Sequence, residues 1–277
     1  MITTVIHASQ LSPQQIHEIQ QVIPGDPIAH AGHYRILHPQ AVDYEHMAEL
    51  RQRVQLDINS LPEGFEAEKV ALVISDMDST FIGIECIDEI ADFAGIKPRV
   101  AEITEAAMRG ELDFEQSLTQ RVSLLEGLTG DALQRVYEER LTLNPGAENL
   151  LQGLRGRSIP FALVSGGFTF FTDRLKQRYK LDFTRSNTLE MEGDTLTGRV
   201  MGNIVGAEAK REFLFELCRQ LKISPEQVIA MGDGANDLLM MKESGLSVAY
   251  HAKPRVQAEA SCVLEHGGLD RVLDLIA

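Results

Sequence analysis

The sequence has only three cysteines, and none of them forms a CxxC pair. An odd number of widely spaced cysteines argues against a disulfide framework and favours reduced, buried thiols. The sequence also lacks an apolar run long enough for a transmembrane helix. Its N-terminus has no basic segment followed by an apolar core, so it does not resemble a signal peptide. Together these absences predict a cytoplasmic protein.

Positive charge is also scarce, with 26 Lys and Arg residues against 41 Asp and Glu residues and a net charge of −15. This balance argues against general binding to nucleic acid or to a membrane surface. It does not exclude an anionic substrate, because a metal ion and a few local cations can reverse the field inside a cleft. The hydrophobic content of 44% over 277 residues is enough for one large domain or two smaller ones.

Two acidic loops that follow apolar runs carry the strongest signal. Val70–Ile74 leads into Asp76-Met77-Asp78-Ser79-Thr80, and Val228–Met231 leads into Gly232-Asp233-Gly234-Ala235-Asn236-Asp237. Open α/β sheets bind ligands at the carboxyl ends of their strands, so we expect the two loops to meet there. Such a set of carboxylates suits Mg²⁺, which prefers oxygen ligands.

Asp76 and Asp78 have two interpretations. Asp and Ser residues favour turns and helix N-caps, so the first loop on its own is compatible with a solvated cap. Alternatively, one carboxylate is a nucleophile and metal ligand while the other transfers a proton, as in enzymes that form an aspartyl-phosphate. The second acidic loop, with Asp233 and Asp237, favours the functional interpretation.

From Val70 onward, predicted strands and helices alternate, which indicates a parallel sheet. Residues 84–145, between the first two strands, have a helical pattern and are expected to form a lid over the carboxyl edge of the sheet. Thr184 to Asn203, with a turn at Glu192-Gly193-Asp194, predicts a hairpin. The expected strands are Val70–Ser75, Pro160–Ser165, Val228–Gly232, Leu246–Ala249 and Cys262–Leu264, and the expected lid helices are Glu85–Ala94, Arg99–Arg109, Phe114–Leu125 and Asp131–Glu139.

Residues 1–68 differ in composition and are predicted to form a small α/β module that ends in the linker Pro62-Glu63-Gly64. Ser12-Pro13 is a typical start for a helix. The spacing of the module's histidines matches no standard metal-ligand pattern, so scattered surface histidines are favoured over a metal site. These residues are six of the eight in the chain: His7, His17, His30, His33, His38 and His46.

Ser165-Gly166-Gly167 follows the second long strand and is compatible with a phosphate cradle, because glycines let the backbone approach a ligand. An ordinary strand-to-helix turn is the alternative. Lys210, at the start of the helical run Ala209–Leu221, offers a cation for a transferring phosphoryl group. In isolation it would be a surface charge.

Arg121 lies on the apolar stripe formed by Phe114, Leu118 and Leu125. It either forms an ion pair within the helices or points into a cleft to bind a carboxylate, and periodicity alone does not separate these. Met108 and Phe114 are candidate apolar walls, although core packing is the commoner use of such residues.

Glu85 lies on one helical face with three other acids: Asp88, Glu89 and Asp92. The pattern alone favours a solvated acidic face. Its place at the start of the helix, shortly after Asp76 and Asp78, keeps a role in the site open.

Taken together, these motifs resemble the phosphoserine phosphatases of the haloacid dehalogenase-like (HAD) superfamily. The resemblance covers roughly residues 70–277, and the lid segment points to this family rather than to the superfamily at large. The matching stretches are Asp76-Met77-Asp78-Ser79-Thr80, Glu85-Cys86-Ile87-Asp88-Glu89-Ile90, Phe114-Glu115-Gln116-Ser117-Leu118, Arg121-Val122-Ser123-Leu124-Leu125, Val164-Ser165-Gly166-Gly167-Phe168, Lys210 and Gly232-Asp233-Gly234-Ala235-Asn236-Asp237.

The resemblance implies an α/β fold, with a HAD-like doubly wound parallel sheet over residues 69–277 and a helical-bundle cap at about 84–145. It implies hydrolysis of O-phospho-L-serine through an aspartyl-phosphate, with Mg²⁺ as cofactor, as the last step of serine biosynthesis. By this resemblance, Asp76 is the nucleophile and a Mg²⁺ ligand, Asp78 is the general acid and base and binds Mg²⁺ through its carbonyl, and Asp233 is a further Mg²⁺ ligand. Asp237 supports the metal site or Lys210. The residues implied to contact the phosphate or the substrate are Ser165, Gly166, Lys210 and Asn236, while Glu85 and Arg121 are implied to bind the substrate's ammonium and carboxylate groups.

Met77 departs from the family pattern, which usually has phenylalanine between the two aspartates, but this apolar exchange is tolerable. Two other functions remain open. One is a HAD phosphatase for another small phosphomonoester, such as phosphohomoserine or phosphoethanolamine. The other is a non-catalytic protein that binds a phosphorylated ligand. A dinucleotide site is disfavoured, because Gly232-Asp233-Gly234 does not continue as GxGxxG. The sequence does not distinguish a monomer from a homodimer.

Overall fold

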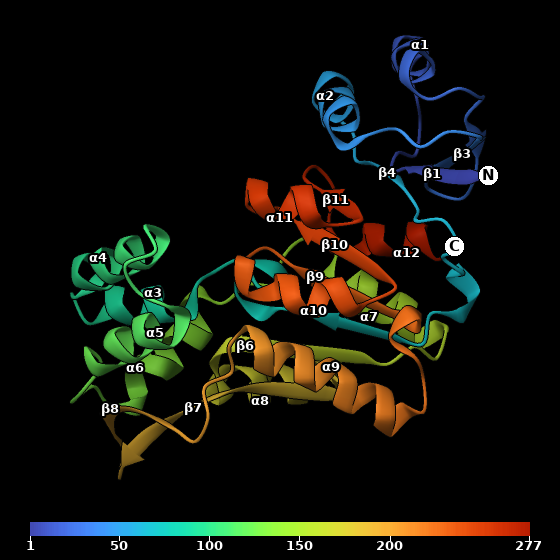
Figure 1. Ribbon diagram of the computed structural model, residues 1–277. Coiled ribbons are helices and arrows are strands. Elements are labelled where there is room, and N and C mark those ends of the chain that lie inside the picture. Colours follow the sequence, from blue (N-terminus) through green and yellow to red (C-terminus); the bar gives the residue numbers. More distant parts are fainter.

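Apolar runs of the chain form the strands of a central seven-stranded sheet (Figure 1). The structure, a computed structural model, describes all residues from 1 to 277. The strand order is β11-β10-β9-β5-β6-β7-β8, and the pair β7–β8 is antiparallel while the others are parallel. The strands are β5 (Leu72–Ser75), β6 (Phe161–Phe168), β7 (Phe183–Glu192), β8 (Thr195–Met201), β9 (Val228–Gly232), β10 (Leu246–Tyr250) and β11 (Cys262–Leu264).

The two apolar runs that precede the acidic loops become the neighbouring central strands β5 and β9. Every residue of both strands is buried, because helices cover both faces of the sheet. Since β5 and β9 run parallel, both acidic loops leave the sheet at the same edge, where open α/β sheets bind ligands.

Helices pack on both faces of this sheet, and alternate strand residues face the two layers. Val73 and Ile229 belong to one apolar cluster, and Ile74 and Ala230 belong to the other. The resulting three layers confirm the predicted doubly wound α/β fold. The helices are α7 (Ala147–Gly156), α8 (Thr169–Tyr179) and α12 (Val272–Leu275) on one face, and α9 (Ala207–Leu221), α10 (Leu238–Glu243) and α11 (Pro254–Glu259) on the other.

Residues 86–140, between β5 and β6, form a helical cap (green in Figure 1). The hairpin β7–β8 reaches under it: Gly130 N donates to Asp194 O at 2.9 Å, and Leu196 N donates to Leu128 O at 2.8 Å. The fourth predicted cap helix begins as an α-helix and continues from Val136 as a π-helical turn. The cap consists of α3 (Cys86–Phe93), α4 (Lys97–Met108), α5 (Phe114–Ser123), α6 (Gly130–Arg135) and the π-type turn η3 (Val136–Arg140).

The remaining elements after residue 66 are short helical turns: η1 (Ala67–Lys69), η2 (Met77–Phe81), η4 (Pro225–Gln227), η5 (Ala235–Asp237) and η6 (Leu269–Arg271). No helix combines the length and the apolar composition that a membrane crossing needs. Cys86, Cys218 and Cys262 are all buried and unpaired, as the sequence predicts.

The N-terminal module (residues 1–68) contains a second sheet, with strands in the order β2-β3-β1-β4 and two helices on one face. This is a split βαβ arrangement. Helix α1 begins after Ser12, whose hydroxyl accepts a hydrogen bond from Gln15 N, and Pro13 is its first residue. The elements are β1 (Ile2–Ile6), α1 (Pro13–Val22), β2 (Ile28–Ala29), β3 (Tyr34–His38), α2 (Tyr44–Val54) and β4 (Ile58–Ser60).

The interpretation of the module's histidines as surface residues is wrong for three of them. His7, His33 and His38 are buried, with exposed fractions of 5%, 2% and 0%. His38 Nε2 lies 2.7 Å from Thr4 Oγ1, and His7 Nδ1 lies 2.9 Å from Asp274 Oδ2. None of these histidines belongs to a group of side chains close enough to share a metal ion.

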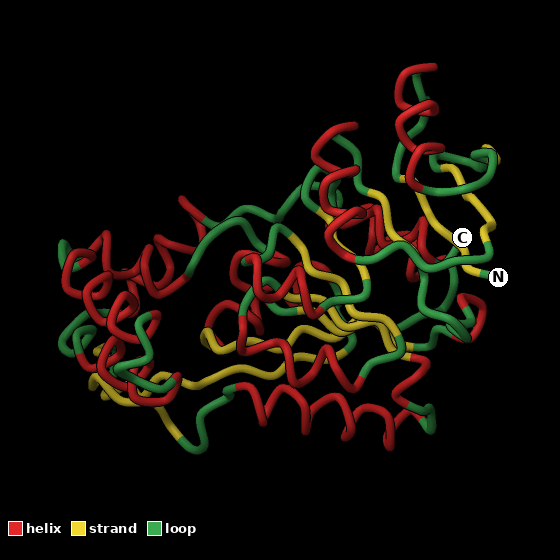
Figure 2. Tube along the Cα trace, turned by 45° about the horizontal axis from the view of Figure 1, so that its top comes forward, coloured by secondary structure: helices red, strands yellow, loops and turns green.

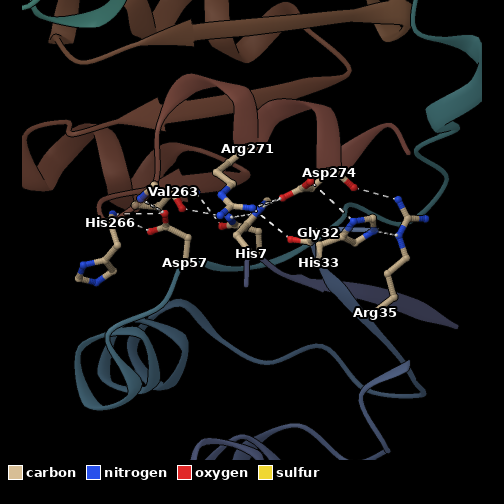
Figure 3. A network of polar contacts seen from close by, with 11 residues as sticks. His7, Gly32, His33, Arg35, Asp57, Val263, His266, Arg271 and Asp274 are labelled. Atoms are coloured by element: carbon tan, nitrogen blue, oxygen red, sulfur yellow. Dashed lines mark hydrogen bonds and ion pairs between the residues drawn. The ribbon is translucent and has the colours of Figure 1, made fainter. Parts of the chain in front are cut away.

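The module docks against the β11 edge of the large sheet, and the cap lies at the opposite end of the molecule (Figure 2). Figure 3 shows the polar contacts of this junction. Asp57 accepts hydrogen bonds from the backbone N–H groups of residues 265, 266 and 267. The Asn59 amide donates to Val263 O at 3.0 Å and accepts from Val263 N at 2.7 Å, which satisfies groups that an open sheet edge would expose.

Candidate active site

Asp76 is the first residue after β5, and its carboxylate is buried at the carboxyl edge of the sheet. Lys210 Nζ lies 2.7 Å from Asp76 Oδ1, and the backbone N–H of Met77 donates to the same oxygen at 2.7 Å. The second carboxylate oxygen has no protein hydrogen bond. Asp76 is therefore held at one oxygen and keeps the other available.

The chain after Asp76 forms the wide turn η2 (Met77–Phe81), which turns Asp78 back over the strand end. Ser79 has a φ of +57°, in the left-handed region that non-glycine residues rarely adopt. The Asp78 carboxylate accepts a hydrogen bond from Cys86 N at 2.9 Å and another from Ser165 Oγ at 3.2 Å. Backbone from the cap and a side chain from β6 thus fix the second aspartate.

The second acidic loop brings two further carboxylates to Asp76. One oxygen each of Asp76, Asp233 and Asp237 lies within 4.8 Å of the other two. Lys210 is fully buried and also contacts Asp237, with Nζ 2.6 Å from Oδ1. Thr80 Oγ1 donates to Asp233 at 3.4 Å. Three carboxylates therefore converge beside a single lysine.

Burial raises the pKa values of Asp76, Asp78 and Asp233, and repulsion by Asp237 adds to the shift at Asp76 and Asp233. Burial, with the charge of Asp237 next, raises the pKa of Asp76 well above its usual range, although Lys210 opposes the shift. Burial also raises the pKa of Asp78. Burial and Asp237 raise the pKa of Asp233 to about 6. A divalent cation would relieve this crowding of negative charge.

The geometry of the acidic cluster fits a hard cation, because carboxylate oxygens from separate strand ends converge on one point. Asp237 belongs to the converging group, although the family resemblance implied only that it supports the metal site or Lys210. The structure also shows supporting contacts: one carboxylate oxygen contacts Lys210, and the other accepts a hydrogen bond from Gly234 N at 3.0 Å. What the structure supports is a candidate metal centre formed by acidic side chains.

Ser165, Gly166 and Gly167 lie at the end of β6, facing Asp78. Ser165 Oγ accepts a hydrogen bond from Gly167 N at 2.7 Å. A Cβ on Gly167 would lie 2.6 Å from Asp78 Oδ2, and a Cβ on Gly166 would lie 2.7 Å from the Phe114 ring. Only glycine permits these close approaches, which explains the Ser-Gly-Gly sequence.

The cap contributes Glu85 and Arg121 to the same region. Glu85 accepts a hydrogen bond from Ser79 Oγ at 2.7 Å. Its side chain stays open to solvent, but surrounding protein and the charge of Asp78 raise its pKa to about 7. Arg121 forms no ion pair, yet the charges of Asp88, Glu85 and Asp78 act on it. The first interpretation of Arg121, an ion pair within the helices, is therefore not seen in the structure.

Other predicted site residues have mixed outcomes. Phe114 packs against Gly166 and Gly206 and closes the cap onto the core. Met108, the other candidate apolar wall, is 72% exposed at the end of α4. Asn236 is half-buried in the loop next to Asp233.

Sequence reasoning missed Asn144, which holds the turn η2 in place. Its side-chain amide donates to Thr80 O at 2.8 Å and to Ile82 O at 3.2 Å. Asn144 stands where the chain returns from the cap, directly before Pro145 and Gly146. An Asn-Pro-Gly turn at the end of a long insertion is the signal that would have indicated it.

Comparisons with known proteins identify the family of this chain. The haloacid dehalogenase-like hydrolase family matches residues 70–245. A phosphoserine phosphatase from Polaromonas sp. is 54% identical over 226 residues, which are 80% of this chain and 96% of that protein.

Solved structures show the same likeness. The unliganded structure of a probable phosphoserine phosphatase from Vibrio cholerae has a TM-score of 0.84 and 38% identity, over 99% of this chain and 86% of that one. A structure described as a phospho-aspartyl intermediate analogue of phosphoserine phosphatase has a TM-score of 0.70 and 39% identity, over 75% of this chain and 99% of that one. The chain belongs to the haloacid dehalogenase-like hydrolases and, within them, to the phosphoserine phosphatases.

Proposed function

We propose that this chain hydrolyses O-phospho-L-serine to L-serine and inorganic phosphate, and that Asp76 carries the phosphoryl group between the two half-reactions. The observation that carries this proposal is the placement of Asp76. It is buried beside Lys210 and the acidic cluster, and the charges of Asp78 and Glu85 act on the cap residue Arg121. The names of the relatives supply the substrate.

Asp76 is suited to attack phosphorus because its carboxylate is fixed at one oxygen only. The attacking oxygen forms a bond to phosphorus while the bond from phosphorus to the serine oxygen breaks. Lys210 offers its charge to both Asp76 and Asp237, so it also lies close to the developing charge on the phosphoryl group.

Mg²⁺ is the cofactor we propose, held by the Asp76 carboxylate, the Asp78 carbonyl and the Asp233 carboxylate. When bound, it supplies positive charge that neutralises the phosphate oxygens. Asp237 keeps Lys210 in place and adds negative charge to the same centre.

Asp78 is the proposed general acid and base. Burial raises its pKa, so the carboxyl group can hold a proton and give it to the departing serine oxygen. The resulting carboxylate then takes a proton from the water that hydrolyses the aspartyl-phosphate. Ser165 and the Cys86 N–H hold both oxygens of Asp78 in place for the two steps.

The remaining candidate residues sort by the part of the substrate that they face. Ser165, Gly166, Lys210 and Asn236 are placed for the phosphate oxygens. Glu85 and Arg121 project from the cap, where Glu85 would bind the ammonium group and Arg121 the carboxylate. The substrate specificity therefore depends on the cap, and the chemistry depends on the sheet edge.

A substrate panel with Mg²⁺ tests the proposal. We expect phosphoserine to be preferred over phosphoethanolamine, which lacks the carboxylate, by about a hundredfold in kcat/KM. Arg121→Lys keeps the charge but loses the planar fork, so it should reduce this preference by about tenfold. An equal preference in the native protein would favour a phosphatase for another small phosphomonoester. An absence of turnover on every substrate would favour the non-catalytic alternative.

A further inference from the structure

Strand β6 leaves its ladder with β7 at the candidate phosphate loop. Val164 pairs with Arg185, but the next pair is Phe168 with Asn187. Three residues of β6, from Ser165 to Gly167, therefore stand opposite a single residue of β7. Such a bulge lifts backbone out of the sheet and leaves its polar groups without ladder partners.

Asn187 spans the gap that this bulge opens. Its amide nitrogen donates to Gly166 O at 2.8 Å, and its side-chain oxygen accepts from Val205 N at 2.8 Å. The side chain is almost fully buried, with an exposed fraction of 1%. Both ends of the amide are thus used inside the protein, and one of them holds the loop.

The peptide group between Gly166 and Gly167 is fixed at both ends. Its carbonyl accepts from Asn187, and its N–H donates to Ser165 Oγ at 2.7 Å. The same Ser165 hydroxyl donates to Asp78. The orientation of this peptide group therefore sets where the Ser165 hydroxyl points.

The other end of the amide reaches the start of the lysine helix. Val205 precedes Gly206, the N-cap of α9, and Lys210 N donates to Gly206 O at 3.0 Å. The Phe114 ring of the cap rests on both Gly166 and Gly206. Asn187 therefore joins the two core segments that carry the candidate phosphate-binding groups and on which the cap closes.

We propose that Asn187 is a positioning residue for phosphate binding, because it holds the Ser165–Gly167 bulge and the N-terminus of the Lys210 helix in one fixed arrangement. This inference rests on the proposed function, which identifies Ser165, Gly166 and Lys210 as groups that bind phosphate. It predicts that loss of the Asn187 amide weakens binding of phosphate but leaves binding of the amino-acid part of the substrate intact, since that part is read by the cap.

Asn187→Ala and Asn187→Asp are the test variants, and Asn59→Ala is the matched control. Asn59 is also buried, and its amide also joins two backbone groups, but it lies at the module junction. Asn187→Asp keeps an acceptor for Val205 N but replaces the donor for Gly166 O by a carboxylate oxygen and adds a negative charge, so it remains informative if the alanine variant does not fold.

The readouts are the inhibition constants of inorganic phosphate and of L-serine, together with phosphate binding followed directly by ³¹P NMR. For both Asn187 variants we expect the phosphate constant to rise about tenfold, as for one lost buried hydrogen bond. The L-serine constant should stay within about twofold of the native value. Asn59→Ala should leave both constants within that range.

Equal phosphate affinity in native protein and folded Asn187 variants would overturn the inference. Equal weakening of phosphate binding and L-serine binding would also overturn it, as would the same loss of phosphate affinity in Asn59→Ala. Either result would indicate a general loss of structural order and not a local effect on the loop. The direct phosphate measurement separates the two claims. If the native protein binds phosphate but does not hydrolyse phosphoserine, the proposed function fails, and the Asn187 variants still report on the loop.

Discussion

The active site and the module junction both bury aspartates, but they treat the charge in different ways. At the junction, Asp57 is 1% exposed and its two oxygens accept backbone hydrogen bonds from residues 265 to 267 (Figure 3). At the site, Asp76 is 5% exposed and has one bonded oxygen, and two other carboxylates crowd it. The Asp57 carboxylate at the junction therefore has hydrogen-bond donors for both oxygens, whereas the carboxylates at the site outnumber the one lysine that contacts them.

This difference separates stability from function. A buried charge with all of its hydrogen bonds made contributes to stability, and removal of it leaves donors unsatisfied. A cluster of buried like charges costs stability until a cation arrives. The pKa of Asp233 is raised to about 6 for this reason, with burial as the larger cause. The two regions should therefore respond to mutation in opposite ways.

The largest effect is expected at Asp76. Asn has the same shape but cannot form an acyl-phosphate, so Asp76→Asn should reduce kcat by about a thousandfold or more. Folding should not suffer, because the native carboxylate is already disfavoured by burial. Steady-state kinetics and a thermal melt in the absence of metal measure the two effects. Turnover within tenfold of native would contradict the assignment of the nucleophile.

Asp57→Ala should show the opposite behaviour. It leaves the backbone N–H groups of residues 265 to 267 without their acceptor at the junction, so the free energy of unfolding should fall by about 1 to 3 kcal/mol. Denaturant unfolding measures this loss. The value of kcat/KM for the folded protein should stay within about twofold of native, since the junction lies away from the cleft. A loss of activity that exceeds the unfolded fraction would show that the two regions are coupled.

Asp233→Asn tests the cost of the acidic cluster. The folded pKa of Asp233 lies above the usual value of 3.8, so the folded state holds this proton more tightly, and stability falls as pH rises through about 6. Without metal, the variant should therefore be more stable than the native protein at pH 7, by roughly 1 to 3 kcal/mol. The advantage should shrink toward pH 4.

The measurement for Asp233→Asn is unfolding in a chelating buffer at several pH values, and Mg²⁺ should stabilise the native protein more than the variant. A variant that is less stable than the native protein at pH 7 without metal would show that the cluster is not strained by its charge.

The smallest effect concerns Glu85. Its pKa is raised to about 7, so the side chain loses its charge as pH falls below that value and can no longer pair with an ammonium group. The KM for phosphoserine should rise a few-fold between about pH 8 and pH 6. Glu85→Gln should have a raised KM that changes much less with pH over this range. An identical pH dependence in the variant would remove Glu85 from substrate binding.

Much of the fold was predictable because its signals are local. Apolar runs placed the strands β5 and β9, and the turn at Gly193 and Asp194 placed the hairpin. The partners of Asp57 lie more than 200 residues away, so no local pattern could reveal them. The buried histidines of the module were missed for the same reason: His7 contacts Asp274, at the far end of the chain.

Prediction of the candidate site was uneven in the same way. Paired acidic loops at strand ends indicated Asp76 and Asp233 directly, since a parallel sheet brings such loops to one edge. The helical pattern favoured a solvated face for Glu85, and only the family resemblance pointed to the site. Asn187 gave no signal, because its place depends on a bulge in the neighbouring strand.

The central claim is that Asp76 takes up the phosphoryl group covalently. The most direct measurement mixes the native protein with ³²P-labelled phosphoserine and Mg²⁺, stops the reaction with acid within milliseconds, and reduces the trapped acyl-phosphate with borohydride. Mass spectrometry should then find homoserine at position 76, with radioactive label on the protein before reduction and none on Asp76→Asn. An active native protein that carries no label, or a modification at a residue other than Asp76, would contradict the account.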